Sequence, residues 1–255
     1  MDSSHQGSAG SGSQAQFPTT RWTHIFEAGG PNSAGAREAL NELCRGYWSP
    51  VYAYLRRKGI DSHQAKDLAQ SFFVHLLEIE FHKVADPNKG RFRSFLLAAL
   101  NNFLKDDWRS RNARKRGGVV QIVSIDENEA EERYDQLPRQ EPDATRIYDR
   151  AWAGTVIEHA KARLKESFAR RRRLAVYEAL APFLAREPDP AKYAELAGRL
   201  KMTRENLQVA LSRMNDTFGQ CLREEIARIV ETPAEIEDEI RYLLSAWSAK
   251  VESVE

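Results

Sequence analysis

Apolar residues recur every three or four positions through most of the chain, the spacing that gathers them on one face of an α-helix. Between positions 36 and 54 this spacing joins Ala36, Leu40, Leu43, Tyr47, Val51 and Tyr54. Pro50 interrupts the run, so we expect a kink or a restart of the helix there. A second run, Leu68, Phe72, Leu76 and Leu77, follows Asp61 and Ser62. Because aspartate and serine are good helix caps, these two residues predict where that helix starts.

The stretch GRFRSFLLAALNNFLKDDWRSRNARKRGG at 90–118 predicts a long amphipathic helix after a loop at 81–91. Its inward face is expected to hold Phe92, Phe95, Leu96, Ala99, Leu100 and Phe103. Its opposite side is expected to hold Ser94, Asn101, Lys105, Trp108 and Arg109. No convincing strand pattern occurs from 37 to 116. The spacing therefore predicts an all-α fold class.

A second helical block is expected from about 148 to 247, interrupted at Pro188-Asp189-Pro190 and at Thr232-Pro233. Within it, KYAELAGRLKMTRENLQVALSRMNDTF at 192–218 predicts two short-linked helices. The expected buried positions are Tyr193, Leu196, Ala197 and Leu200 in the first helix, and Leu207, Ala210, Leu211 and Met214 in the second. A tight turn through Lys201-Met202 separates them, and Thr203 is placed to cap the second helix. This is the spacing of a helix-turn-helix, whose second helix enters the DNA major groove.

A final helical pattern consists of Ile236, Ile240, Leu243, Leu244 and Trp247. Such a helix would either complete the core of the second block or dock an inhibitory protein.

Composition limits the class of protein. The chain has 255 residues of which 42% are hydrophobic, enough for one or two modest cores. Cys44 and Cys221 lie far apart without metal-ligand spacing, which argues against a zinc site or a disulfide framework and fits a reducing cytoplasm. No apolar run approaches the roughly 20 residues that span a bilayer, and the N-terminus does not read as a signal peptide. We expect a soluble, cytoplasmic protein with no membrane partner.

The net charge of +1 conceals a segregated charge distribution. Residues 119–148 carry the carboxylates Asp126, Glu127, Glu129, Glu131, Glu132, Asp135, Glu141 and Asp143. Pro138 and Pro142 argue against a long helix there. We expect four parts: a disordered tail at 1–16, a helical domain at 17–118, an acidic linker at 119–147 and a second helical domain at 148–255.

The polar side of the helix at 90–118 suits single-stranded nucleic acid. Aromatic side chains stack on bases for about 1–3 kcal/mol each, while cations follow the phosphates. A plainer interpretation is that Trp108 covers a core edge and the arginines form a solvated surface. The density of basic residues at Arg109, Arg111, Arg114, Lys115 and Arg116 favours phosphate binding.

The second of the two short-linked helices offers side chains for duplex DNA. Arg204, Glu205, Gln208 and Ser212 are expected to project outward near its start. Glutamine reads adenine and arginine reads guanine through paired hydrogen bonds. Two packed helices that touch no DNA are the alternative.

No catalytic set, metal site or cofactor site is predicted. The histidines are scattered with no nucleophile beside them, and Asp106-Asp107 lacks a third partner at metal-ligand spacing. A nucleic-acid-processing enzyme remains the least favoured alternative.

Four segments in this order resemble bacterial RNA polymerase sigma factors of the sigma-70 family, specifically the extracytoplasmic-function (ECF) type. They are YWSPVYAYLRRKG at 47–59, AKDLAQSFFVHLLE at 65–78, the basic helix at 90–118 and YAELAGRLKMTRENLQVALSRM at 193–214. The resemblance covers about residues 17–247. It implies a sigma region 2-like helical bundle and a sigma region 4-like helix-turn-helix, joined by the acidic linker.

The resemblance also implies sites. Asp67, Gln70 and Phe73 match the helix that docks on the clamp coiled coil of core RNA polymerase. The −10 recognition and melting residues would be Asn88, Lys89, Arg91, Arg93, Asn101, Asn102, Lys105, Trp108, Arg109 and Arg111. The −35 residues would be Thr203, Arg204, Glu205, Gln208, Ser212 and Arg213. The linker would thread toward the polymerase cleft, and an anti-sigma protein is an expected inhibitory partner.

These expectations combine into one leading function. The chain is predicted to be a non-enzymatic sigma factor whose partners are core RNA polymerase and promoter DNA, both duplex and melted non-template strand. A stand-alone helix-turn-helix regulator is the alternative.

Overall fold

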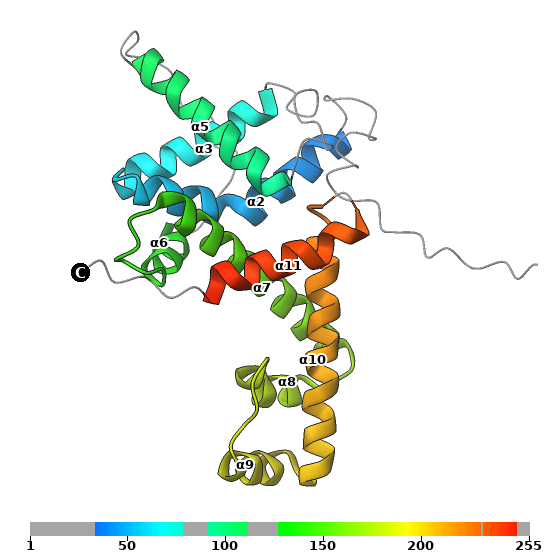
Figure 1. Ribbon diagram of the computed structural model, residues 1–255. Coiled ribbons are helices and arrows are strands. Elements are labelled where there is room, and N and C mark those ends of the chain that lie inside the picture. Colours follow the sequence, from blue (N-terminus) through cyan, green and yellow to red (C-terminus); the bar gives the residue numbers. More distant parts are fainter. Residues whose placement is uncertain (1–33, 79–90, 112–126, 231, 249–255) are drawn as a thin grey trace, which may run out of the picture.

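The computed structural model describes residues 34–78, 91–111, 127–230 and 232–248; within helices, the side chains of 34–45, 77–78, 108–111 and 127–130 lie outside the description. In these ranges the regular elements are helices, and no strand occurs among them. They are α2 (Ala34–Arg57), α3 (Ser62–Glu78), α5 (Phe92–Arg111), α6 (Glu127–Asp135), α7 (Ala144–Arg170), α8 (Leu174–Leu180), the short 3₁₀ helix η2 (Ala181–Phe183), α9 (Pro190–Leu200), α10 (Arg204–Ile226) and α11 (Pro233–Ser248) (Figure 1). The predicted all-α fold class is confirmed.

Two helix features follow directly from the sequence. In α2 the helix bends at Tyr47, whose φ of −116° and ψ of 18° are not helical. Pro50 lies one turn later and has no N–H to donate to the preceding turn, which explains the predicted kink. At the start of α3, the Gln64 N–H donates to Asp61 Oδ1 at 3.0 Å, so Asp61 caps this helix as expected.

The long helix α7 is the centre of the molecule. It packs against α2, α10 and α11. Its first turns are buried on more than one side, and Trp152 stacks on Tyr47 of α2 with ring centroids 4.1 Å apart and planes 10° apart. Asp143 caps it by accepting from the Thr145 N–H at 2.8 Å. Because α7 has apolar residues on several sides, it can join helices from both halves of the chain.

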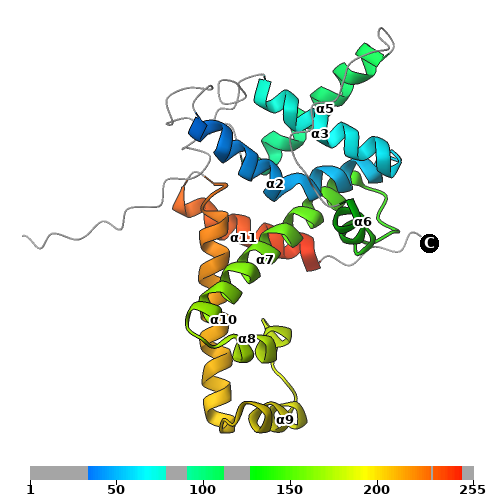
Figure 2. The same ribbon diagram turned by 180° about the vertical axis from the view of Figure 1, so that it is seen from behind.

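The hydrophobic core is continuous from α2 to α11. It includes Tyr47 and Phe72 from the first half of the chain and Trp152, Leu211 and Leu243 from the second. The elements of the two predicted domains therefore share buried contacts in this conformation, and the division at 119–147 stays a prediction. The far part of the molecule, with α8, α9 and the start of α10, extends away from this body as an arm (Figure 2).

The described part of the acidic segment is folded onto α2. Glu131 of α6 pairs with Arg56 Nη2 at 2.8 Å and accepts a hydrogen bond from the Tyr52 hydroxyl. Arg57 donates to the main-chain oxygens of Pro138 and Arg139, both at 2.7 Å. The described residues of this segment are therefore packed against α2. Residues 119–126 lie outside the description.

The predicted turn between α9 and α10 is confirmed. Lys201 adopts the left-handed conformation (φ 51°, ψ 46°), and the Met202 N–H donates to the Ala197 carbonyl at 3.0 Å, which closes α9. The Thr203 hydroxyl then accepts from the Asn206 N–H at 3.3 Å and starts α10. Leu207, Leu211 and Met214 are buried, as their spacing predicted.

Candidate nucleic-acid interface

Helix α5 buries its apolar face and leaves a stripe exposed. Phe92, Leu96 and Leu100 are buried, while Phe95, Ala99 and Phe103 pack half-buried against the core, as predicted. Ser94, Ala98, Asn102 and Lys105 are exposed at steps of three or four residues, and Asp106 is exposed next to Lys105. We call Ser94, Ala98, Asn102 and Lys105 the α5 stripe. It places an amide and a cation on neighbouring turns, a combination that suits a polyanion.

Asn101 is not on this stripe. The Tyr54 hydroxyl donates to Asn101 Oδ1 at 2.8 Å, and Asn101 Nδ2 donates to the Leu97 carbonyl at 3.0 Å. Both ends of the amide are thus engaged within the protein. Asn101 was expected to face outward, and the structure corrects this placement, because helical spacing cannot foresee the Tyr54 partner supplied by α2.

Arg93 also departs from the expected DNA-facing placement, since only 7% of it is exposed. Its guanidinium pairs with Asp149 of α7 and, through Nε at 3.1 Å, with Glu239 of α11. Burial by itself lowers the pKa of Arg93, but the two carboxylates more than offset that effect and raise it. Arg93 is therefore firmly charged.

Arg91 and Tyr242 complete this group. Arg91 Nη1 lies 2.8 Å from Glu239 Oε2. The Tyr242 hydroxyl donates to Asp149 Oδ2 at 2.6 Å, and the Tyr242 ring lies 4.1 Å from the Arg93 guanidinium carbon. Burial and the hydrogen bond to Asp149 raise the pKa of Tyr242. We call Arg91, Arg93, Asp149, Glu239 and Tyr242 the arginine cluster.

Five other predicted −10 residues cannot be placed by their side chains. Asn88 and Lys89 lie outside the described residues. Trp108, Arg109 and Arg111 lie in the last turns of α5, where the side chains are outside the description. Their roles stay predictions.

The predicted polymerase-binding residues of α3 do not share one surface. Asp67 is exposed, but Gln70 is 8% exposed and Phe73 is 3% exposed within the core. Of the three residues expected to contact the polymerase, the structure therefore leaves Asp67 accessible and buries Gln70 and Phe73. The outward side of α3 instead continues from Asp67 to Ser71 and Val74, both half-buried. The apolar spacing of α3 holds the signal for this, because Leu68, Phe72 and Leu76 set the inward direction.

Helix α10 exposes all the side chains proposed for −35 recognition. Arg204, Glu205, Gln208, Ser212 and Arg213 are exposed, and Thr203 is exposed at the cap. The Glu205 carboxylate is stabilised by its own backbone N–H and by Thr203, which lowers its pKa. Val209 is also exposed, and the sequence reading missed it. The sequence could have shown this, because Val209 falls outside the spacing of the buried residues Leu207, Leu211 and Met214.

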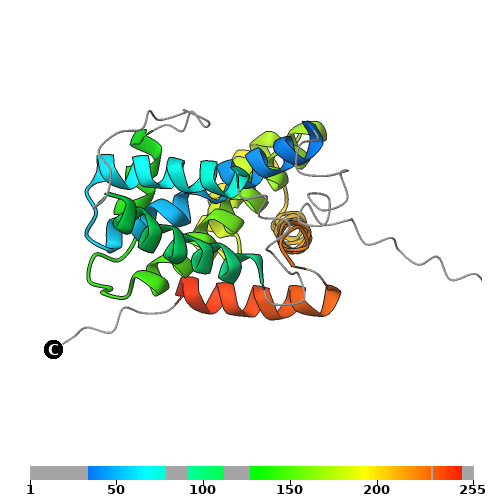
Figure 3. The same ribbon diagram turned by 90° about the horizontal axis from the view of Figure 1, so that it is seen from above.

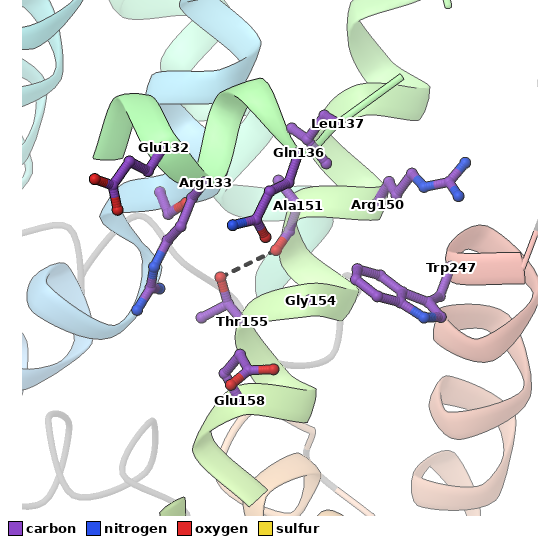
Figure 4. A pocket seen from close by; sticks show the side chains of 11 residues that line it. Glu132, Arg133, Gln136, Leu137, Arg150, Ala151, Gly154, Thr155, Glu158 and Trp247 are labelled. Atoms are coloured by element: carbon purple, nitrogen blue, oxygen red, sulfur yellow. Dashed lines mark hydrogen bonds between the residues drawn. The ribbon is translucent and has the colours of Figure 1, made fainter. Parts of the chain in front are cut away.

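A cavity lies between α6, α7 and the end of α11 (Figure 4). Trp247 faces Gly154 across this cavity. Its charged lining residues are Glu132, Arg133, Arg150 and Glu158. The Thr155 hydroxyl beside it donates to the Ala151 carbonyl at 3.0 Å. The lining mixes both charge signs, so it indicates no particular ligand.

The described residues contain no group of three or more His, Cys, Asp or Glu side chains arranged to hold a metal ion. None of the described helices combines the length and the apolar character needed to cross a bilayer.

Comparisons with known proteins show which family the chain resembles. Residues 43–114, which include α3 and α5, match the family model described as Sigma-70 region 2. Over 146 residues the chain is 26% identical to the ECF RNA polymerase sigma factor SigE of Mycolicibacterium smegmatis, covering 57% of this chain and 50% of that protein. The chain thus spans about half the length of the curated relative it matches. No solved structure matches the chain.

These matches confirm the predicted resemblance, and the family that they point to is non-enzymatic. Residues 43–114 of this chain match a sigma-70 region 2 domain, and the chain is a distant homologue of the ECF sigma factor SigE.

Proposed function

We propose that this protein is a sigma factor that binds core RNA polymerase and directs promoter recognition and DNA melting. The observation that carries the proposal is the α5 stripe, which lies within the residues that match sigma-70 region 2. Asn102 and Lys105 are exposed on it, on a helix whose other side is packed in the core. Because packing already orders this helix, its exposed cation and amide can contact a DNA backbone without a further loss of conformational entropy in the helix.

The remaining DNA contacts are proposed from the family resemblance. Trp108 would stack on an unpaired base, and Arg109 and Arg111 would follow the backbone beyond it. For the α9–α10 pair we propose −35 recognition, supported by the exposure of Arg204, Gln208 and Arg213 beside the Thr203 cap. Residues 119–147 as a linker and an anti-sigma protein as an inhibitor are further proposals from the same resemblance.

The test is run-off transcription with core RNA polymerase on a template library, with promoters mapped by sequencing. Lys105→Ala should lower open-complex formation by several-fold, because one phosphate contact is lost. Lys165→Ala is the matched control, since Lys165 is an exposed lysine of α7 outside the matched family segment. Absence of any promoter-dependent transcript with the wild-type protein would reject the proposal.

A stand-alone duplex-DNA regulator is the second candidate, favoured by the exposed start of α10 alone. Permanganate footprinting separates the two functions, because it detects unpaired thymines. Trp108→Ala should reduce melting more than duplex binding in a sigma factor. Equal losses of both would favour the regulator.

A further inference from the structure

The arginine cluster ties together three helices that are distant in sequence. Arg91 and Arg93 lie at the start of α5, Asp149 lies in α7, and Glu239 lies in α11. In the view from above, the start of α5 lies over the middle of α11 (Figure 3). Two arginines face two carboxylates, so the cluster is neutral only while α11 is docked.

Besides Tyr242, whose ring lies 4.1 Å from the Arg93 guanidinium carbon, α11 is connected to α5 by Glu239. Glu239 is 1% exposed. Its Oε1 accepts a hydrogen bond from Arg93 Nε at 3.1 Å, while its Oε2 forms an ion pair with Arg91 at 2.8 Å that lacks hydrogen-bond geometry. A carboxylate held between two arginines occupies the position that a phosphate oxygen would take. A DNA backbone would compete for the same donors.

Beyond Glu239, α11 is held by the Tyr242 hydroxyl, which donates to Asp149 of α7, by an exposed ion pair between Glu237 and Arg223 of α10, and by a small apolar contact. Ile236 and Leu243 are buried, whereas Leu244 and Trp247 are exposed. The helix thus completes the core, as one of the two sequence-based expectations held, but with few buried apolar side chains. Helices with few buried contacts open more readily than those in the centre of a core.

We infer that α11 is an intramolecular latch, whose Glu239 shields Arg91 and Arg93 until DNA phosphates displace it. This inference rests on the proposed function, because it takes the start of α5 as part of the DNA-binding surface. Arg93 keeps Asp149 when the latch opens, so Arg91 gains the most freedom. The apparent DNA affinity is the affinity of the open state multiplied by the fraction of molecules in which the latch is open.

The experiment measures binding of a fluorescent promoter fork, with an unpaired −10 non-template strand, to the protein assembled with core RNA polymerase. Anisotropy titrations are repeated over a series of potassium chloride concentrations. Glu239→Gln should bind the fork about 3–10-fold more tightly, because the closed state loses its charge pairing. The slope of log affinity against log salt should also steepen by roughly 0.7 for each arginine that gains a phosphate.

Asp238→Asn is the matched control. Asp238 lies next to Glu239 in the same helix, is exposed, and pairs with Arg241 of α11 instead of with α5. It should keep wild-type affinity and salt slope. An equal gain in Asp238→Asn would show a general charge effect and would overturn the latch, as would unchanged or weaker binding by Glu239→Gln.

A second measurement does not depend on the folding of a variant. Hydrogen exchange of peptides from 233–248 in the wild-type complex should become faster when the promoter fork is added, and unchanged protection would overturn the latch.

The sigma function and the latch fail under different outcomes. If the wild-type protein gives no promoter-dependent transcript, the sigma function is rejected and the latch with it. If the wild-type protein transcribes normally but Glu239→Gln binds the promoter fork like wild type, the latch alone is rejected.

Discussion

Glu225 shows how a single buried carboxylate joins two helices. It is 5% exposed on α10 and lies 3.0 Å from Nδ1 of His159 on α7, with Arg163 and Arg228 nearby. Burial alone would raise the pKa of Glu225, but the hydrogen bond and charge of His159, together with both arginines, hold it below the usual 4.5. Because the folded-state pKa is lowered, this carboxylate stabilises the fold above about pH 4.5, and the stabilisation is lost as the pH falls through the lowered value.

Glu225→Gln should therefore lower the free energy of unfolding by about 1–3 kcal/mol at pH 7, because the cations around it lose a charged partner. The difference between variant and wild type should shrink as the pH falls below 4.5. Urea unfolding at a series of pH values from 7 downward measures both effects. Glu158→Gln is the control, since Glu158 forms an exposed pair with Lys161 and should change stability by less than about 1 kcal/mol. A difference independent of pH would contradict this account of Glu225.

At the scale of the element, α3 separates what faces the core from what faces a partner. Asp67 lies outward, in line with Ser71 and Val74, whereas Gln70 and Phe73 lie inward. If α3 is the polymerase-binding helix, Asp67 makes the polar contact with the polymerase. The buried Gln70 affects binding only by stabilising the folded helix.

Asp67→Ala should weaken capture of core RNA polymerase several-fold without a change in melting temperature, because it removes an exposed charge. Gln70→Ala should lower the melting temperature, with any loss of capture following the loss of folded protein. Surface plasmon resonance against immobilised core polymerase, alongside thermal melts, measures the two effects. Gln64→Ala, an exposed polar residue of the same helix, should leave both unchanged. Full capture by Asp67→Ala would remove this site assignment.

At the scale of the whole molecule, the shared core makes a prediction about cooperativity. Trp152 of α7 stacks on Tyr47 of α2 and lies within 5.9 Å, centroid to centroid, of the Phe92 ring of α5. Elements linked by such buried contacts unfold together. Thermal unfolding followed by far-ultraviolet circular dichroism and by tryptophan fluorescence should therefore give coincident single transitions. Two separated transitions would instead show that the two halves are independent domains, as the sequence reading expected.

The sequence by itself determined the features that depend on neighbours within one or two turns. The kink before Pro50, the caps at Asp61 and Thr203, the turn at Lys201 and the buried side of α5 all lie where local spacing predicted them. Capping bonds, the missing proline donor and amphipathic periodicity are local, so the chain carries them wherever it folds.

Only the tertiary structure decided which outward positions stay accessible. Helical spacing gives the direction of Arg93 and Asn101 around the axis of α5, but not the helix that will cover them. Arg93 meets Asp149 and Glu239, and Asn101 meets Tyr54, through partners between 47 and 146 residues away in the chain. These pairings depend on how α2, α7 and α11 pack together, and packing at such separations leaves no trace in the periodicity of a single helix.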